Sequence, residues 1–202
     1  MSVLAKAATG AACAVLGLLL LVAASASALF SMLAGGLIGP SSAAQAPALY
    51  SGSTTVRCTV SGGIRGASFG LDPAQAGDAA VIARVARADG LPAQAIVIAL
   101  ATALQESGLR NLAYGDRDSL GLFQQRPSQG WGSPAEILNP SYAAQQFYSH
   151  LTRVPDWWSM PLWKAAQAVQ RSANPTAYEK WQLEASAIQE FLGSHPQLCS
   201  LS

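Results

Sequence analysis

Residues 93–108 read AQAIVIALATALQESG, and the predicted fold is built around this stretch. Up to Leu104 it holds one amide, one threonine and no charged side chain. A helix that is apolar almost all round belongs in the middle of a core rather than on a surface. Pro92 is typical of the start of a helix and Gly108 of its end. We therefore expect a buried helix that ends at Ser107.

One acidic side chain, Glu106, lies in the last turn of this expected helix. It shares a face with Ala95, Ala99 and Thr102, because these residues precede it by eleven, seven and four positions. An ionised carboxylate there meets partial desolvation, a low local dielectric and the negative end of the helix dipole, and each raises its pKa. A raised pKa suits a general acid that must stay protonated near neutral pH. The alternative is a solvated glutamate at a frayed helix end, since exposed glutamates are common.

Other helix boundaries are marked by capping residues, proline and glycine. Asp72 followed by Pro73 predicts a helix that runs to about Asp89 and stops at Gly90. Further helices are expected after the same kind of signal, over residues 139–151, 161–172 and 175–192.

A polar, glycine-containing stretch, residues 111–132, interrupts this helical pattern. It is too broken for a long helix, and we expect a short β-hairpin near residues 114–124. The predicted fold class is therefore mainly α, or α+β, with a helical domain over residues 71–202 and one small β-hairpin or irregular insertion.

The N-terminal part of the chain is strongly apolar. Residues 7–56 contain no Asp, Glu, Lys or Arg, and residues 11–33 are almost wholly apolar. As a helix rising about 1.5 Å per residue, the second range is long enough for a hydrocarbon core of roughly 30 Å. The length favours an uncleaved transmembrane anchor over residues 1–38. The alternative is a secretory signal with a long apolar part, cleaved at a small-residue triplet such as residues 24–26 or 44–46.

Both interpretations place the rest of the chain at the outer face of the membrane, either in a single-pass cell-membrane protein or in a secreted one. Residues 39–70 are rich in Ser, Gly, Ala and Pro, and we expect a flexible linker there. Cys58 and Cys199 flank the predicted domain, and in an oxidising compartment they can form a disulfide; the alternative is two free thiols. His150 and His195 are far apart and lack metal-ligand spacing with the cysteines, so no metal and no cofactor is expected.

The charge balance bears on the class of partner. The chain has 12 Lys and Arg against 11 Asp and Glu, a net charge of +1, and only 11% of its residues are charged. Proteins that bind nucleic acids electrostatically normally carry a basic patch or stripe. We therefore expect no nucleic-acid partner.

Two neighbouring motifs resemble a known family. The sequence Glu106-Ser107-Gly108 is followed after a short insertion by residues 121–124, GLFQ. Together they resemble the paired signature of lysozyme-like lytic transglycosylases, in which the first motif ends the catalytic helix and the second faces it across the cleft.

Three weaker similarities extend the resemblance over about residues 78–191. Residues 168–170, AVQ, resemble the family's Ala-Tyr-Asn motif with its last two residues replaced, and Tyr178 falls where the family has a tyrosine near the acid. The run of residues 115–131 also resembles a group of actinobacterial secreted or membrane-anchored proteins.

The resemblance implies a lysozyme-like fold and peptidoglycan glycan strands as the substrate. In that chemistry, protonated Glu106 donates to the glycosidic oxygen between N-acetylmuramic acid and N-acetylglucosamine. As a carboxylate it then deprotonates the muramyl 6-hydroxyl, which closes a 1,6-anhydro ring. A hydrolase of the same fold needs a second carboxylate, for which Asp118, and less so Asp116, is a candidate. The alternative for both aspartates is an ordinary turn, with Arg117 paired to one of them.

Substrate contacts are expected around these motifs. The Gln124 amide is expected to hold a substrate acetamido group or to orient Glu106, and Ser107 either bonds near the acid or caps the helix end. Aromatic side chains are candidates for stacking on sugar rings, although in a small domain they more often lie in the core. The candidate substrate-binding residues are Ser107, Gly121, Phe123, Gln124, Tyr114, Trp131, Tyr142 and Tyr178.

Three functions remain open on the sequence. The first is a lytic transglycosylase, and the second is a muramidase that adds water, which gives no anhydro-muramyl ends. The third is a catalytically silent module that binds glycan or anchors to the cell wall, against which the presence of Glu106 argues.

Overall fold

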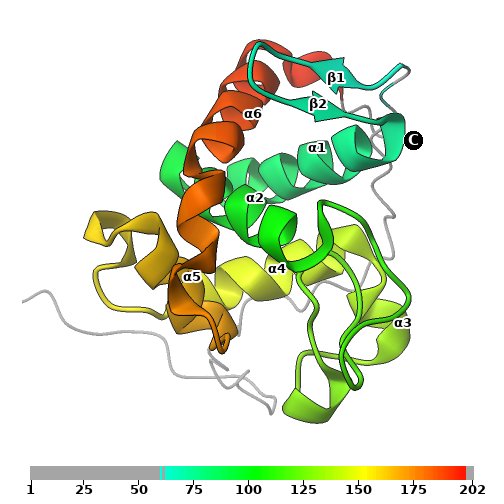
Figure 1. The fold of residues 1–202 in the computed structure, drawn as a ribbon, viewed down its shortest axis with the longest axis vertical. Helices are drawn as coiled ribbons and strands as arrows, with labels where there is room; N and C mark the ends of the chain where they lie inside the picture. The colour runs from blue at the N-terminus through cyan, green and yellow to red at the C-terminus, as the bar shows by residue number, and fades with distance from the viewer. Residues whose placement is uncertain (1–59, 61, 199–202) are drawn as a thin grey trace, which may run out of the picture. The chain divides into compact units, whose positions relative to one another are not determined.

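The computed structural model describes Val60 and residues 62–198, which form a mainly helical domain (Figure 1). The α-helices are α1 (Pro73–Ala88), α2 (Ala93–Ser107), α3 (Pro134–Ile137), α4 (Pro140–Leu151), α5 (Leu162–Gln170) and α6 (Gln182–Ser194). Short 3₁₀ helices join or follow them, namely η1 (Pro127–Gln129), η2 (Trp157–Ser159), η3 (Pro175–Trp181) and η4 (Pro196–Leu198). The strands β1 (Ile64–Arg65) and β2 (Gly70–Leu71) pair antiparallel. The predicted mainly α class is confirmed.

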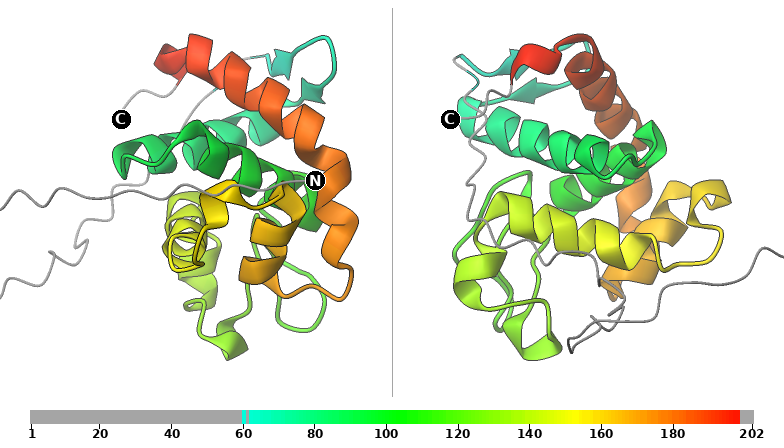
Figure 2. Two further views of the ribbon diagram at one scale, coloured as in Figure 1. Left: turned by 90° about the vertical axis from the view of Figure 1, so that its left-hand side faces the viewer. Right: turned by 180° about the vertical axis from the view of Figure 1, so that it is seen from behind.

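The helix predicted to be buried, α2, lies at the centre of the domain. Every residue from Ala95 to Leu104 is buried. The helices α1, α4, α5, α6 and η3 all contact α2. In Figures 1 and 2, α1 and α2 lie between α6 on one side and α4 on the other. An apolar helix is stable here because neighbouring elements cover its faces and keep its side chains from water.

The first helix begins at the capping signal that the sequence predicts. The Asp72 carboxylate accepts hydrogen bonds from the backbone N–H groups of Ala74 at 2.9 Å and Gln75 at 3.0 Å. The Gln75 side chain in turn accepts from the Asp72 N–H at 3.0 Å. This reciprocal pair is a capping box, which satisfies N–H groups that have no partner within the helix. The predicted end is confirmed too, because Asp89 is the C-cap.

The β structure lies elsewhere than expected. The ribbon of β1 and β2 falls largely within residues 39–70, which were predicted to be a linker. Ile64 and Leu71 face one another in the ribbon and are 2% and 5% exposed, so this part of the chain belongs to the core. Phe69 also packs edge-on against Phe191 of α6, with ring centroids 6.3 Å apart. The prediction that the domain begins at residue 71 is therefore wrong for this part of the linker.

The hairpin predicted near residues 114–124 is not formed. One isolated bridge, between Leu120 and Gln125, is the β pairing of that segment. The backbone has positive φ at Arg117, Gly121 and Gln124, with values of 56°, 74° and 48°. A strand needs extended backbone throughout, so these left-handed residues replace the hairpin by successive turns.

The later helices lie where they were predicted, except that one predicted helix is divided into two elements. α4 begins after Asn139, whose side chain caps it, and α5 lies within the predicted range. The single helix expected over residues 175–192 is instead η3 followed by α6. In a 3₁₀ helix, residues three apart eclipse one another, so Tyr178 and Trp181 lie along one side of η3.

Several predictions fall outside the described residues. They are the anchor or signal over residues 1–38, most of the linker, and the Cys58–Cys199 disulfide. In the part of the chain that the structure describes, no helix combines the length and apolar character needed to cross a bilayer.

Candidate active site

Glu106 lies in the last turn of α2 and is half-buried. The Tyr178 hydroxyl donates a hydrogen bond to its Oε1 at 2.7 Å. Burial raises the pKa of Glu106 above the ordinary value, and the hydrogen bond from Tyr178 acts in the opposite direction but is the smaller influence. The direction predicted from the sequence is confirmed, and its main cause is desolvation.

Tyr178 is itself fully buried, on η3. Burial, and after it the nearby charge of Glu106, raises the pKa of Tyr178. The phenol therefore keeps its proton and acts as a donor toward Glu106. Of the two carboxyl oxygens of Glu106, Oε1 is the one that accepts the hydrogen bond from Tyr178.

The chain turns sharply after Glu106. Gly108 is left-handed at φ 65° and donates to the Leu104 carbonyl at 3.1 Å. Leu109 follows at φ 58°, is fully buried and donates to the Ala103 carbonyl at 3.1 Å. Glycine adopts this backbone without the clash of a Cβ, whereas a leucine held there needs the surrounding core to keep it in place.

Ser107 joins the end of α2 to residues 121–124. Its hydroxyl lies 2.8 Å from the Leu122 carbonyl and 3.1 Å from the Ala103 carbonyl, and it accepts from the Arg110 N–H at 3.1 Å. The GLFQ motif is thus next to the end of the helix that carries Glu106, although 15 residues separate Ser107 from Leu122. Because these backbone groups occupy the hydroxyl, Ser107 holds the site together rather than offering a free group to a ligand.

Residues 121–124 contact the end of α2 and its neighbours mainly through backbone groups. Gly121 has φ 74°, and a Cβ there would lie 2.7 Å from the Ile137 carbonyl oxygen, so only glycine fits. Phe123 is 1% exposed and stacks on Phe147 with ring centroids 4.8 Å apart. Its predicted contact with substrate is wrong for the side chain, because the ring is in the core. The Gln170 amide donates to the Phe123 carbonyl at 2.8 Å, so the third motif also contacts this segment.

Gln124 holds a loop in place. Its amide nitrogen donates to the carbonyls of Gly121 at 3.2 Å and Tyr114 at 3.3 Å, which uses both of its N–H groups. A Cβ on Gly115 would overlap this amide, so the loop closes on Gln124 only because residue 115 is glycine. An acetamido contact by Gln124 stays a prediction, and its remaining acceptor is the amide oxygen.

The two candidate second carboxylates are placed differently. Asp118 accepts from the Arg126 Nε at 2.6 Å through one oxygen and from the Ser128 N–H at 2.8 Å through the other. Hydrogen bonds from Ser128, and then from Arg126, hold the pKa of Asp118 well below its ordinary value. The Asp116 side chain is 91% exposed beside Arg117, at 4.0 Å. Both aspartates match the turn interpretation, and Arg126 rather than Arg117 is the partner of Asp118.

The aromatic side chains that the sequence suggested for sugar stacking differ in how exposed they are. Tyr114 is 72% exposed. Trp131 is half-buried and stacks on His150, with ring centroids 4.1 Å apart. Tyr142 is half-buried and lies so close to Gly132 that a Cβ there would be 2.6 Å from its hydroxyl. Stacking of these rings on sugars stays a prediction.

Contacts that the sequence did not suggest also surround Glu106. The Trp181 indole N–H donates to the side-chain oxygen of Gln105 at 2.9 Å. Tyr178 and Trp181 are three residues apart, so η3 contacts two consecutive residues of α2. Within the described residues, no group of three or more His, Cys, Asp or Glu side chains is arranged to hold a metal ion.

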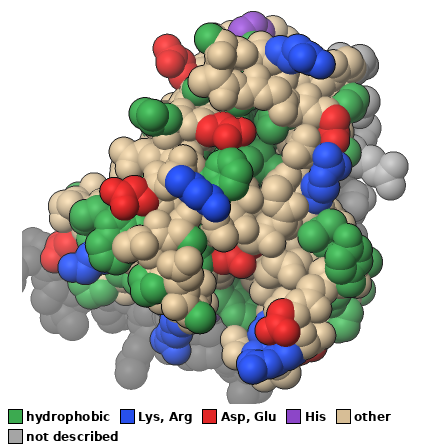
Figure 3. Space-filling view, in the orientation of Figure 1, with side chains coloured by type: hydrophobic (Ala, Val, Ile, Leu, Met, Phe, Trp, Pro, Cys, Tyr) green, Lys and Arg blue, Asp and Glu red, His purple; other side chains and the backbone are tan. Residues whose placement is uncertain are grey.

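The face of the molecule seen in Figure 3 carries both positively and negatively charged side chains. In Figure 3 acidic and basic side chains are interspersed with polar and apolar ones, and no large area has a single sign.

A scan of the chain against protein-family models finds no match, and a search of curated proteins finds no similar sequence.

Proposed function

We propose that this protein has a lysozyme-like fold and cleaves the glycan strands of peptidoglycan between N-acetylmuramic acid and N-acetylglucosamine. The proposed reaction is that of a lytic transglycosylase, with Glu106 as the only catalytic carboxyl group. The observation that carries the proposal is a half-buried carboxyl with a raised pKa at the end of a buried helix, held by Tyr178. The neighbouring GLFQ segment, bonded to Ser107, supports it.

The reaction begins with proton donation. Burial raises the pKa of Glu106 and so favours its protonated form, and this proton passes to the glycosidic oxygen as the bond to the muramyl C1 breaks. The resulting carboxylate takes the proton of the muramyl 6-hydroxyl, whose oxygen bonds to C1 and closes the 1,6-anhydro ring. No water is consumed, and Glu106 ends in the protonated form in which it began.

Tyr178 fits a supporting role in both steps. Its hydrogen bond to Oε1 stabilises the carboxylate between the two proton transfers and fixes the plane of the carboxyl group. In the proposed reaction the proton is exchanged through Oε2. Burial raises the pKa of Glu106 and this hydrogen bond lowers it, so the two opposed influences together set the pKa of the acid/base.

The surroundings of Asp118 favour this reaction over hydrolysis. A muramidase needs a second carboxylate to attack the sugar or to activate water. Both oxygens of Asp118 are engaged by Arg126 and Ser128, and Asp116 is almost fully exposed. We place the protein at the outer face of the cell membrane, attached through its N-terminal segment or secreted.

The deciding experiment is digestion of purified peptidoglycan by the full chain in mild detergent, followed by mass spectrometry of the fragments. Fragments with 1,6-anhydro-muramyl ends, absent with Glu106→Gln, are expected. Glu190→Gln is the matched control, because it makes the same change at an exposed site on α6.

Other outcomes contradict the proposal in defined ways. Reducing muramyl ends without anhydro ends identify a muramidase. Binding to glycan strands without any fragments, in both the natural protein and Glu106→Gln, identifies a silent binding module.

A further inference from the structure

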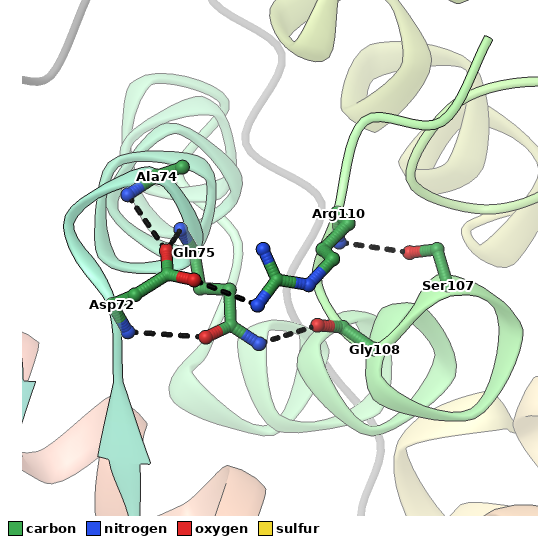
Figure 4. A network of polar contacts seen from close by, with 6 residues as sticks. All are labelled: Asp72, Ala74, Gln75, Ser107, Gly108 and Arg110. Carbon is green, nitrogen blue, oxygen red and sulfur yellow. Dashed lines mark hydrogen bonds and ion pairs between the residues drawn. The ribbon is translucent and has the colours of Figure 1, made fainter.

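The first turn of α1 contacts the chain where it leaves α2. Figure 4 shows the side chains of Asp72 and Gln75 on one side, and Gly108 and Arg110 on the other. These two segments are 33 to 38 residues apart in the sequence. The contacts join the start of one helix to the end of the helix that carries Glu106.

Gln75 takes part in two contacts through one amide group. Its oxygen accepts from the Asp72 N–H at 3.0 Å, which completes the capping box of α1. Its nitrogen donates to the Gly108 carbonyl at 2.8 Å. Carbonyls at the end of a helix have no partner inside the helix, so this bond satisfies a group that α2 leaves open.

Asp72 also has two partners. One carboxylate oxygen caps α1 through Ala74 and Gln75, and the other accepts from the Arg110 Nη2 at 2.7 Å. The pair is partly exposed, with the Arg110 side chain 51% and the Asp72 side chain 40% accessible. An exposed ion pair adds little stability, but it restricts where the chain after Gly108 can run.

The contact continues into the site. The Arg110 N–H donates to the Ser107 hydroxyl at 3.1 Å. That hydroxyl has one hydrogen of its own, and its shorter acceptor contact is the Leu122 carbonyl at 2.8 Å. The position of Arg110 therefore affects both the last turn of α2 and residues 121–124.

We propose that Gln75 is a positioning residue for Glu106, and that it acts by holding the Gly108 carbonyl, with the Asp72–Arg110 pair holding the next turn. This inference rests on the proposed function. The N–H groups of Gly108 and Leu109 bond to α2, and the Gln75 amide adds a hydrogen bond to the Gly108 carbonyl from a different helix. A misplacement of about 1 Å in a catalytic group can lower a rate by roughly 100-fold.

The test is Gln75→Glu in the full chain. Glutamate is the other usual residue of a capping box, so its oxygen still accepts from the Asp72 N–H. A carboxylate cannot donate to the Gly108 carbonyl, and the two oxygens repel. The substitution therefore keeps the hydrogen bond that caps α1 and removes the hydrogen bond to the end of α2. Gln94→Glu is the matched control, since it makes the same change at an exposed site in the first turn of α2.

We expect Gln75→Glu to lower kcat about ten-fold and to change KM for glycan strands by less than about two-fold. The amide protons of Gly108 and Leu109 should exchange about ten-fold faster with deuterium, because their turn has lost its contact. Gln94→Glu should leave kcat, KM and both exchange rates unchanged. A purely structural role for Gln75 instead predicts a lower Tm with the natural kcat for the folded fraction.

Two results overturn the inference. Unchanged exchange at Gly108 and Leu109 shows that Gln75 does not hold the turn. Faster exchange with an unchanged kcat shows that the turn does not position Glu106. If the natural protein makes no glycan fragments, the proposed function fails instead, and the exchange rates still establish whether Gln75 holds the end of α2.

Discussion

The end of α2 and the loop of residues 116–128 each present a carboxyl group, with opposite acid–base properties. Glu106 is half-buried and receives one hydrogen bond, from an uncharged phenol, and burial raises its pKa. Asp118 receives hydrogen bonds from Ser128 and from the cationic Arg126, and these hold its pKa well below the ordinary value. Desolvation favours the neutral acid, whereas donors and a positive charge favour the carboxylate. Of these two carboxyl groups, Glu106 is therefore the one favoured in its protonated form, and Asp118 stabilises its loop.

The largest expected effect is at Glu106. Glu106→Gln should lower glycan cleavage at least about 1,000-fold, because it removes the only proposed acid and base. The raised pKa means that ionising Glu106 costs stability as the pH rises through that pKa. The amide variant should therefore have the same or a higher Tm at pH 7, measured by calorimetry. A strong fall in Tm would show that the loss of activity comes from unfolding.

The next effect is at Tyr178. Tyr178→Phe removes the hydrogen bond that lowers the pKa of Glu106, while the ring still fills its buried place. The pKa of Glu106 should rise, and because the proposed reaction starts from protonated Glu106, the alkaline limb of the kcat–pH profile should move to higher pH. We expect a loss of about ten-fold in kcat near pH 6. An unmoved alkaline limb would mean that Tyr178 does not influence the titration of Glu106.

A smaller effect on activity is expected at Asp118. Asp118→Asn should lower cleavage only about two- to three-fold, through a looser loop. A loss as large as that of Glu106→Gln would break the comparison and favour a muramidase that uses both carboxyl groups.

Stability measurements on Asp118→Asn sharpen the same comparison. The folded pKa of Asp118 lies below the unfolded one, so its contribution is present above about pH 4 and is lost as the pH falls. The Tm of Asp118→Asn should be a few degrees lower than that of the natural protein at pH 7, and the difference should shrink below pH 4.

The smallest effect is expected at a third carboxyl group, Asp78 on α1. Burial raises its pKa to about 7, opposed by the N–H of Asn111 and aided by the charge of Asp72. Its favourable contribution is present below the ordinary pKa of 3.8 and is lost as the pH rises through about 7. Asp78→Asn should therefore gain Tm relative to the natural protein between pH 4 and 8, with unchanged kcat. A constant difference across this range would mean that Asp78 does not titrate there.

Features that depend on only a few neighbouring residues were predicted well from the sequence. Asp72, Gly108 and Asn139 lie at helix boundaries as predicted, because each acts on backbone groups within about four residues. The expected environment of Glu106 followed from the apolar run before it. The hairpin near residues 114–124 was wrong because its turns place left-handed residues where strands were expected.

Contacts across the fold were less accessible to prediction. Nothing in the order of residues distinguishes Arg126 from Arg117 as the partner of Asp118. Phe123 was expected to face a ligand, and only its packing on Phe147 shows that it faces the core. The ribbon of β1 and β2 lies in a Gly- and Ser-rich stretch, where burial of Ile64 and Leu71 outweighs the weak strand signal.

From its amino-acid order alone, this chain specifies a buried helix that ends in an acidic residue, and the helices with capping signals around it. Caps, glycine turns and apolar periodicity act over a few residues, so they can be read without knowing the fold. The hydroxyl of Tyr178 on Glu106, the amide of Gln75 on Gly108 and the hydroxyl of Ser107 at Leu122 arise when distant segments pack together. The strength of each of these hydrogen bonds depends on how much water the packing removes. Desolvation is a property of the assembled core rather than of residues that are neighbours in the sequence.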